Sequence, residues 1–149
     1  MYMKLVKRQV EQPQEVVITI SYMNWTEELE DIENYILGAN KHITGYGSNR
    51  EMIPIRIEDI LYFEAVGELV FAYTKEQIYE IKMRLYQIEE SLKESKLRRA
   101  SKSILVNLRK IISVRPALNG RLYAKMENEE EILISRQYAK EVIAEIMGT

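Results

Sequence analysis

The chain has 149 residues, a formal net charge of −2 and 46% hydrophobic residues, which is enough apolar material for the core of one domain with a small extension. It contains no cysteine, which excludes disulfides, thiolate metal sites and a cysteine nucleophile and fits a reducing compartment. No apolar run approaches the roughly 18 residues of a membrane-spanning helix, and the first residues turn polar too early for a signal peptide, so we expect a cytoplasmic protein.

Residues 1–48 are predicted to form an N-terminal extension made of one strand and one helix. Residues 15–22 alternate apolar and polar side chains and are rich in β-branched types, which predicts a strand. Asn24 is followed three residues later by Glu27, a capping-box pattern that predicts the start of a helix, and Gly38 is a plausible end for it. The outer face of this helix is acidic and would repel DNA, so we expect the β-α unit to lie away from any nucleic acid.

The remaining residues, 49–149, are predicted to form one domain, after a loop or boundary at 39–51 that contains two glycines. Short β-type segments occur at 53–57, 60–65, 69–74, 77–82, within 97–114, at 121–127 and at 132–135. Helices are expected near 83–95 and after Ser135, which would act as the N-cap. Asn119-Gly120 is a strong signal for a two-residue type I′ turn. The pattern predicts a mainly β fold with short helices, an antiparallel α+β arrangement.

Basic residues cluster in the second half of the chain. Between Lys93 and Arg115 there are eight basic residues and one acid, Glu94. A local field of this sign attracts phosphates even when the whole chain is acidic. Charge alone leaves a solvated surface as the alternative.

Four segments, in order, resemble the LytTR DNA-binding domain of bacterial response regulators. They are 57–65 (IEDILYFEA), 97–111 (LRRASKSILVNLRKI), the Asn119-Gly120 hairpin and 132–138 (ILISRQY). The resemblance covers about residues 50–148. It implies an elongated arrangement of mostly antiparallel β-sheets with short helices, whose loops enter successive major grooves on one face of the DNA. A helix-turn-helix is therefore not expected.

The resemblance places Lys102 and Arg136 at positions that approach DNA, and these two are the expected base readers. The family's central motif often reads His-Arg-Ser before a Val-Asn pair, whereas this chain has Ser101-Lys102-Ser103, so the bases that Lys102 reads are left open. The turn at 66–68 matches a third DNA-facing loop and lacks an obvious base reader. Phosphate contacts are expected from five side chains: Arg98, Arg99, Ser101, Ser103 and Lys110.

Several of these polar residues have structural alternatives. Lys102 could instead be a solvated strand residue, and Arg136 could pair with Glu130 or Glu141. Asn107 is expected to support a turn by local hydrogen bonding rather than to touch DNA.

The predicted function is a sequence-specific transcriptional regulator that binds promoter repeats in double-stranded DNA as a homodimer. An enzyme is not expected, because the single histidine, His42, has no evident partner and no metal-ligand spacing or phosphate loop appears. No cofactor, metal or small-molecule substrate is expected either. There is no room for a full phosphoacceptor receiver domain, and the resemblance implies instead a membrane protein that restrains the regulator. A protein-interaction module without direct DNA binding is the alternative, since the acidic β-α unit has no counterpart in the DNA-binding domain.

Overall fold

The computed structural model describes residues 3–11, 16–38 and 41–148. Within them, strands form a seven-stranded sheet in the order β2-β1-β5-β4-β3-β7-β6 and a three-stranded sheet in the order β10-β9-β8. Every strand pairing is antiparallel, as predicted. The elements are α1 (Glu27–Gly38), β1 (His42–Tyr46), β2 (Met52–Arg56), β3 (Ile60–Val66), β4 (Leu69–Thr74), β5 (Ile78–Ile81), α2 (Leu85–Ser91), β6 (Leu97–Ser101), β7 (Ile104–Asn107), β8 (Ile111–Pro116), β9 (Leu122–Met126), β10 (Glu131–Ile134) and α3 (Arg136–Met147).

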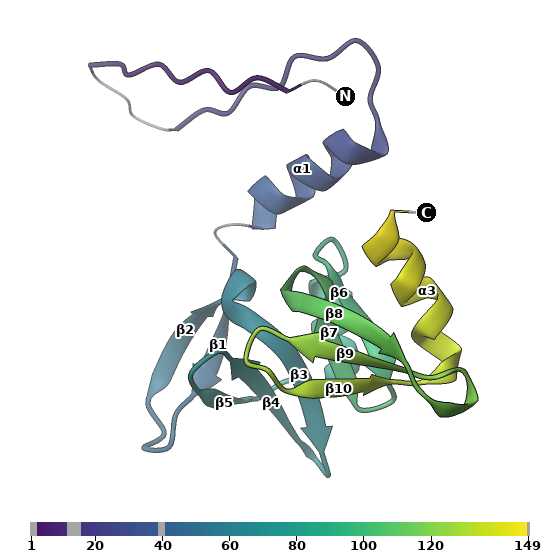
Figure 1. Cartoon of the computed structure of the whole chain (residues 1–149). Coiled ribbons are helices and arrows are strands. Elements are labelled where there is room, and N and C mark those ends of the chain that lie inside the picture. Colours follow the sequence, from purple (N-terminus) through teal and green to yellow (C-terminus); the bar gives the residue numbers. More distant parts are fainter. Residues whose placement is uncertain (1–2, 12–15, 39–40, 149) are drawn as a thin grey trace.

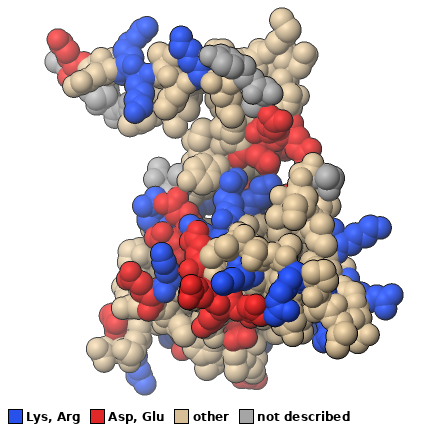
Figure 2. All heavy atoms as spheres, in the orientation of Figure 1, with Lys and Arg blue, Asp and Glu red and all other residues tan. Residues whose placement is uncertain are grey.

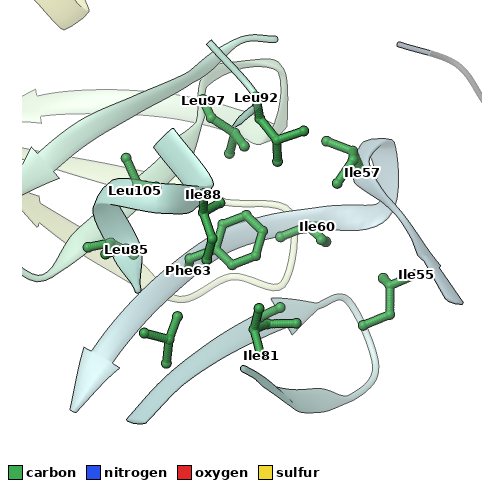
Figure 3. Close-up of a cluster of buried hydrophobic side chains, with 12 residues drawn as sticks. Ile55, Ile57, Ile60, Phe63, Ile81, Leu85, Ile88, Leu92, Leu97 and Leu105 are labelled. Carbon is green, nitrogen blue, oxygen red and sulfur yellow. The ribbon is translucent and has the colours of Figure 1, made fainter. Parts of the chain in front are cut away.

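Apolar side chains fill two cores, one on each side of the larger sheet. The first core packs α2 against the sheet, with Phe63 fully buried and Ile88 of α2 beside it (Figure 3). The second core joins the same sheet to the three-stranded sheet and to α3. β3 contributes side chains to both cores. An irregularity in its pairing with β4, between Ile60 and Tyr62, alters the alternation of its side chains between the two faces. Ile60 and Phe63 therefore enter the first core, and Leu61 and Tyr62 enter the second.

The predicted strand at 15–22 does not form in the residues that the structure describes. Residues 16–22 are extended but pair with no other strand, and they are almost entirely exposed. A strand needs a neighbouring strand for its backbone groups, and within the described residues neither 3–11 nor 16–22 is assigned a strand pairing. The following helix is present, but its cap differs from the prediction. The Oγ1 atom of Thr26, rather than Asn24, accepts a hydrogen bond from the Leu29 amide at 3.3 Å.

The loop predicted at 39–51 is also partly wrong, because its central part is strand β1. β1 pairs along its whole length with β2 and meets β5 at Tyr46, so this segment belongs to the larger sheet. Gly45 allows the close packing here. A Cβ atom at this position would lie 2.3 Å from Cδ1 of Ile55 and 2.9 Å from Cβ of Tyr79.

Other local predictions are confirmed. Asn119 and Gly120 have φ angles of 63° and 75°, as a type I′ turn requires, and they join β8 to β9. Ser135 occupies the N-cap position of α3, but its side chain forms no capping hydrogen bond, and Gly148 ends the helix at φ 70°. Among the described residues, none of the helices is long and apolar enough to cross a membrane.

A pair of stacked tyrosines connects the two sheets. Tyr62 and Tyr73 face each other across β3 and β4, with ring centroids 4.3 Å apart. The hydroxyl of Tyr62 donates to Glu130 in the β9–β10 turn at 2.5 Å, and that of Tyr73 donates to Glu64 at 2.9 Å. Burial and the bond to Glu130 raise the pKa of Tyr62 well above its ordinary value. Burial and the bond to Glu64 raise the pKa of Tyr73 to about 12.

These shifts predict a loss of stability in alkali. Ionisation is easier in the unfolded chain, where a tyrosine has a pKa of 10.0, than in the fold. The stabilisation is therefore complete below pH 10 and declines above it, and the part contributed by Tyr73 is lost as the pH rises through about 12. A Tyr62→Phe, Tyr73→Phe variant is expected to unfold about 1–2 kcal/mol more easily than the parent at pH 8. Urea unfolding across the alkaline range should show the difference closing with rising pH. A difference that stays constant to pH 12 would contradict the assignment.

Candidate DNA-binding interface

The β6–β7 hairpin presents the central predicted motif at its tip. Lys102 and Ser103 form the turn between the two strands, and both are exposed. The Ser103 amide donates to Oγ of Ser101 at 3.2 Å, and the Nη1 atom of Arg99 donates to the carbonyl of Lys102 at 2.8 Å. The Lys102 side chain forms no ion pair within the described part of the chain. Hydrogen bonds therefore stabilise this turn, and the turn exposes the Lys102 side chain to solvent.

Backbone hydrogen bonds join this hairpin to two neighbouring segments. The Ala65 amide donates to the carbonyl of Ser103 at 2.8 Å, which places the β3–β4 turn beside the β6–β7 turn. The Ser135 amide donates to the carbonyl of Ala100 at 2.8 Å, which places the start of α3 at the end of β6. The turns and the start of α3 lie along the lower right of the molecule in Figure 1. Three segments that are distant in sequence thus meet at one end of the fold.

Arg136 is the first residue of α3 and is exposed. The alternative pairing with Glu130 or Glu141 does not occur, and Arg136 has no ion pair among the residues described. Its side chain lies against the β8–β9 turn. A Cβ atom added at Gly120 would lie only 3.2 Å from Cγ of Arg136. The Asn119-Gly120 turn therefore contacts the Arg136 side chain and also closes the β8–β9 hairpin.

The three remaining basic candidates are held by partners inside the protein. Arg98 pairs with Glu145 of α3 at 2.7 Å, Arg99 with Glu89 at 3.3 Å, and Lys110 with Glu127 at 3.7 Å. Their side chains are 29%, 18% and 26% exposed. The structure thus brings Ser101, Lys102, Ser103 and Arg136 to one end of the molecule, with Arg99 bracing the β6–β7 turn from behind, while the cations of Arg98 and Lys110 join elements of the fold.

Arg121 and Lys140 are further cations near the turns that the sequence motifs do not identify. Arg121 directly follows the Asn119-Gly120 turn and donates from Nε to the carbonyl of Leu118 at 2.9 Å. Lys140 is exposed on α3, one helical turn after Arg136 and so on the same face. Their positions after a type I′ turn and at an i+4 spacing are the signals that could have identified them. In Figure 2 separate Lys and Arg side chains project from the lower right of the body.

A shallow hollow of about 470 Å³ lies between the β3–β4 and β6–β7 turns. Its walls include the cations Arg84, Arg99 and Lys102, together with one acid, Glu68. The β3–β4 turn otherwise presents Gly67, with a φ of 63°, so it offers backbone rather than a base-reading side chain. Three cations against one acid give this hollow, which the start of α2 also lines, a charge that suits an anion.

Asn107 is confirmed as a structural residue. It is buried at 5% exposure. Its Oδ1 atom accepts from the Arg109 amide at 3.1 Å, and its Nδ2 atom donates to the carbonyl of Ile60 at 2.8 Å. It holds the end of β7 against the start of β3 and does not reach the surface. Among the residues that the structure describes, no group of three His, Cys, Asp or Glu side chains is placed to hold a metal ion.

Comparison with known proteins gives a consistent assignment. The family model described as LytTr DNA-binding domain matches residues 50–147. An uncharacterised HTH-type transcriptional regulator of Staphylococcus aureus strain bovine RF122 is 28% identical over 129 residues, covering 86% of this chain and 87% of that protein. The sensory transduction protein LytT of Bacillus anthracis is 25% identical over 78% of this chain and 47% of its own length.

A solved structure shares the fold. It is the LytTr DNA-binding domain of a putative methyl-accepting/DNA response regulator from Bacillus cereus, with a TM-score of 0.66 and 22% identity over 74% of this chain and 99% of that one. The match to the Staphylococcus aureus relative covers more of this chain than residues 50–149 supply. The similarity therefore extends upstream of the family domain, toward α1.

Proposed function

This chain belongs to the LytTr DNA-binding domain family, and from that premise we propose that it is a transcriptional regulator that reads specific double-stranded sequences through its turns. The observation that carries the proposal is the meeting of two exposed cations without ion pairs in the described residues, Lys102 and Arg136, at one end of the fold. In the described residues the three helices are separated by strands, so no tandem recognition helix competes with the turns.

The geometry of the turns suits the major groove. The groove is about 12 Å wide and admits a two-stranded β-ribbon, and the β6–β7 hairpin carries Lys102 at its tip. Lys102 can donate to the acceptor atoms of guanine. Arg136 lies in the first turn of α3, where the helix dipole disfavours a cation. A phosphate beside it would relieve this mismatch and accept from the free amides of the helix start.

The proposal also covers the oligomeric state, the partners and the domain boundary. We propose a homodimer that binds promoter repeats in the cytoplasm and is restrained by a membrane protein. We further propose that the DNA-binding unit begins near His42 rather than at residue 49, because β1 is part of the larger sheet. Residues 1–38 would then form a separate extension.

Salt-dependent binding to DNA tests the function itself. The full chain should bind a duplex from the promoter upstream of its own gene in a fluorescence anisotropy titration. The logarithm of the binding constant should fall linearly with the logarithm of salt concentration, with a slope of about −0.9 for each phosphate contact. A scrambled duplex of equal length is the control and should bind at least about 1,000-fold more weakly. No salt-dependent binding to either duplex would favour the protein-interaction module.

A further inference from the structure

An apolar arm precedes α1 and lies outside both cores. We define the arm as residues 3–11 and 16–25. It exposes large side chains that soluble proteins normally cover, among them Leu5 at 81%, Val17 at 70% and Met23 at 95% of their surface. In Figure 1 the arm extends beyond α1, away from the body of the fold. Many large apolar side chains exposed on one segment indicate an interaction site, and backbone that pairs with no strand in the described residues is a template for another chain.

The arm ends in an aromatic contact just before α1. The rings of Tyr22 and Trp25 meet edge to face with centroids 5.0 Å apart, and the helix begins two residues later. α1 is attached to the body by an ion pair between Asp31 and Lys96 at 2.8 Å and by the guanidinium of Arg109, which lies 4.8 Å from the ring centre of Tyr35. The arm therefore continues directly from a helix that is bound to the body.

The arm and α1 lie at the opposite end of the fold from the DNA-facing turns. Lys96, which binds α1, directly precedes β6, whereas Lys102 directly follows it. Five strand residues separate the two, so their Cα atoms are six residue steps apart, about 20 Å at roughly 3.3 Å per residue. A partner on the arm and α1 would therefore leave the turns open to DNA.

The arm and α1 carry opposite charges. The described arm presents the exposed cations Lys4, Lys7 and Arg8 and one exposed acid, Glu11, so its charge is positive. α1 presents the exposed acids Glu27, Glu28, Glu30 and Glu33. None of these three cations and four helix acids forms an ion pair within the described residues. In Figure 2 the acids gather at α1 while the basic groups of the arm lie apart from them. Each chain therefore exposes a basic arm and an acidic helix that form no ion pairs with each other within the described residues.

We propose that the arm and α1 form the homodimer surface, with the arm of each copy lying on α1 of the other. Such an interface repeats the same contact twice about a two-fold axis. Burial of the apolar arm supplies the stabilisation, and the charge pattern sets partner and orientation. The inference deepens the proposed function, since it names the surface through which the regulator would dimerise. It rests on the charges and exposure of residues outside the DNA-facing end.

Charge reversal in two separate variants tests this arrangement. Lys7→Glu with Arg8→Glu makes the arm acidic, and Glu27→Lys with Glu28→Lys makes α1 basic. Each variant alone should raise the dimer dissociation constant at least tenfold, because each repulsion occurs twice in the symmetric dimer. An equimolar mixture should regain dimers, since each arm then meets an α1 of opposite charge. Sedimentation velocity of the full-length chains, at tens of micromolar, measures the mass directly.

The controls separate this inference from the proposed function. Lys75→Glu with Lys125→Glu reverses two exposed cations outside the arm and away from α1, and should leave the dimer intact. A monomeric parent chain, variants that remain dimeric alone, or a mixture no more dimeric than its components would each overturn the proposal. Binding of each monomeric variant to a single half-site is measured in parallel. A dimeric parent that fails to bind any DNA would reject the proposed function while leaving the dimer surface standing.

Discussion

Replacing Lys102 and Arg136 together with alanine is expected to weaken binding to the specific duplex by about 2–6 kcal/mol, at roughly 1–3 kcal/mol for each base contact. Both side chains are exposed, and neither has an ion pair within the described part of the chain. Their removal should therefore cost little folding stability, because nothing buried loses a partner. Anisotropy titrations of the parent and double variant on the same duplex, at one salt concentration, measure the effect.

Single variants and a matched control make this result specific. Lys75→Ala with Lys93→Ala removes the same charge from exposed positions away from the turns and should change the affinity much less. If Lys102 contacts a base, Lys102→Ala should also relax discrimination at one position of the site, whereas loss of a phosphate contact would weaken all sequences alike. Unchanged affinity in the double variant would reject both site residues.

Much of the β domain was predictable because its signals are local. The β3–β4 hairpin follows from two short β-type runs on either side of Gly67, and the β8–β9 hairpin follows from Asn119-Gly120, whose backbone angles few other residue pairs adopt easily. The bond from the Arg109 amide to Asn107 also follows from local turn chemistry. Each of these features depends on neighbours in sequence, whereas the second bond of Asn107, to the Ile60 carbonyl 47 positions away, does not.

The errors arose where distant contacts decide the outcome. Residues 16–22 have strand composition, but a strand requires a partner, and no local pattern reveals that one is missing. The two glycines of residues 39–51, Gly45 and Gly47, predict a loop, yet Gly45 is needed within β1 where Ile55 and Tyr79 pack close. Likewise the pairing of Arg98 with Glu145 joins residues 47 positions apart. Sequence spacing could not show that this cation is engaged inside the fold.

Replacing Asn107 with alanine is expected to destabilise the fold by about 2–4 kcal/mol. The change removes the hydrogen bonds to the Ile60 carbonyl and the Arg109 amide, and each buried group left without its partner costs roughly 1–3 kcal/mol. Ile60 is fully buried, so water cannot replace the lost donor at its carbonyl without opening the first core. Urea unfolding followed by circular dichroism measures the change.

Asn128 provides the matched control for this variant. Its Oδ1 atom accepts from the Glu130 amide at 3.2 Å in an exposed turn, so water can replace it, and Asn128→Ala should cost less than about 1 kcal/mol. Equal effects of the two substitutions would show that burial does not determine the contribution of Asn107. Because Asn107 lies away from the turns, its alanine variant should bind DNA normally once folded. The Lys102, Arg136 variant should show the reverse, normal stability with weakened binding, and together the two results separate the residues that hold the fold from those proposed to read DNA.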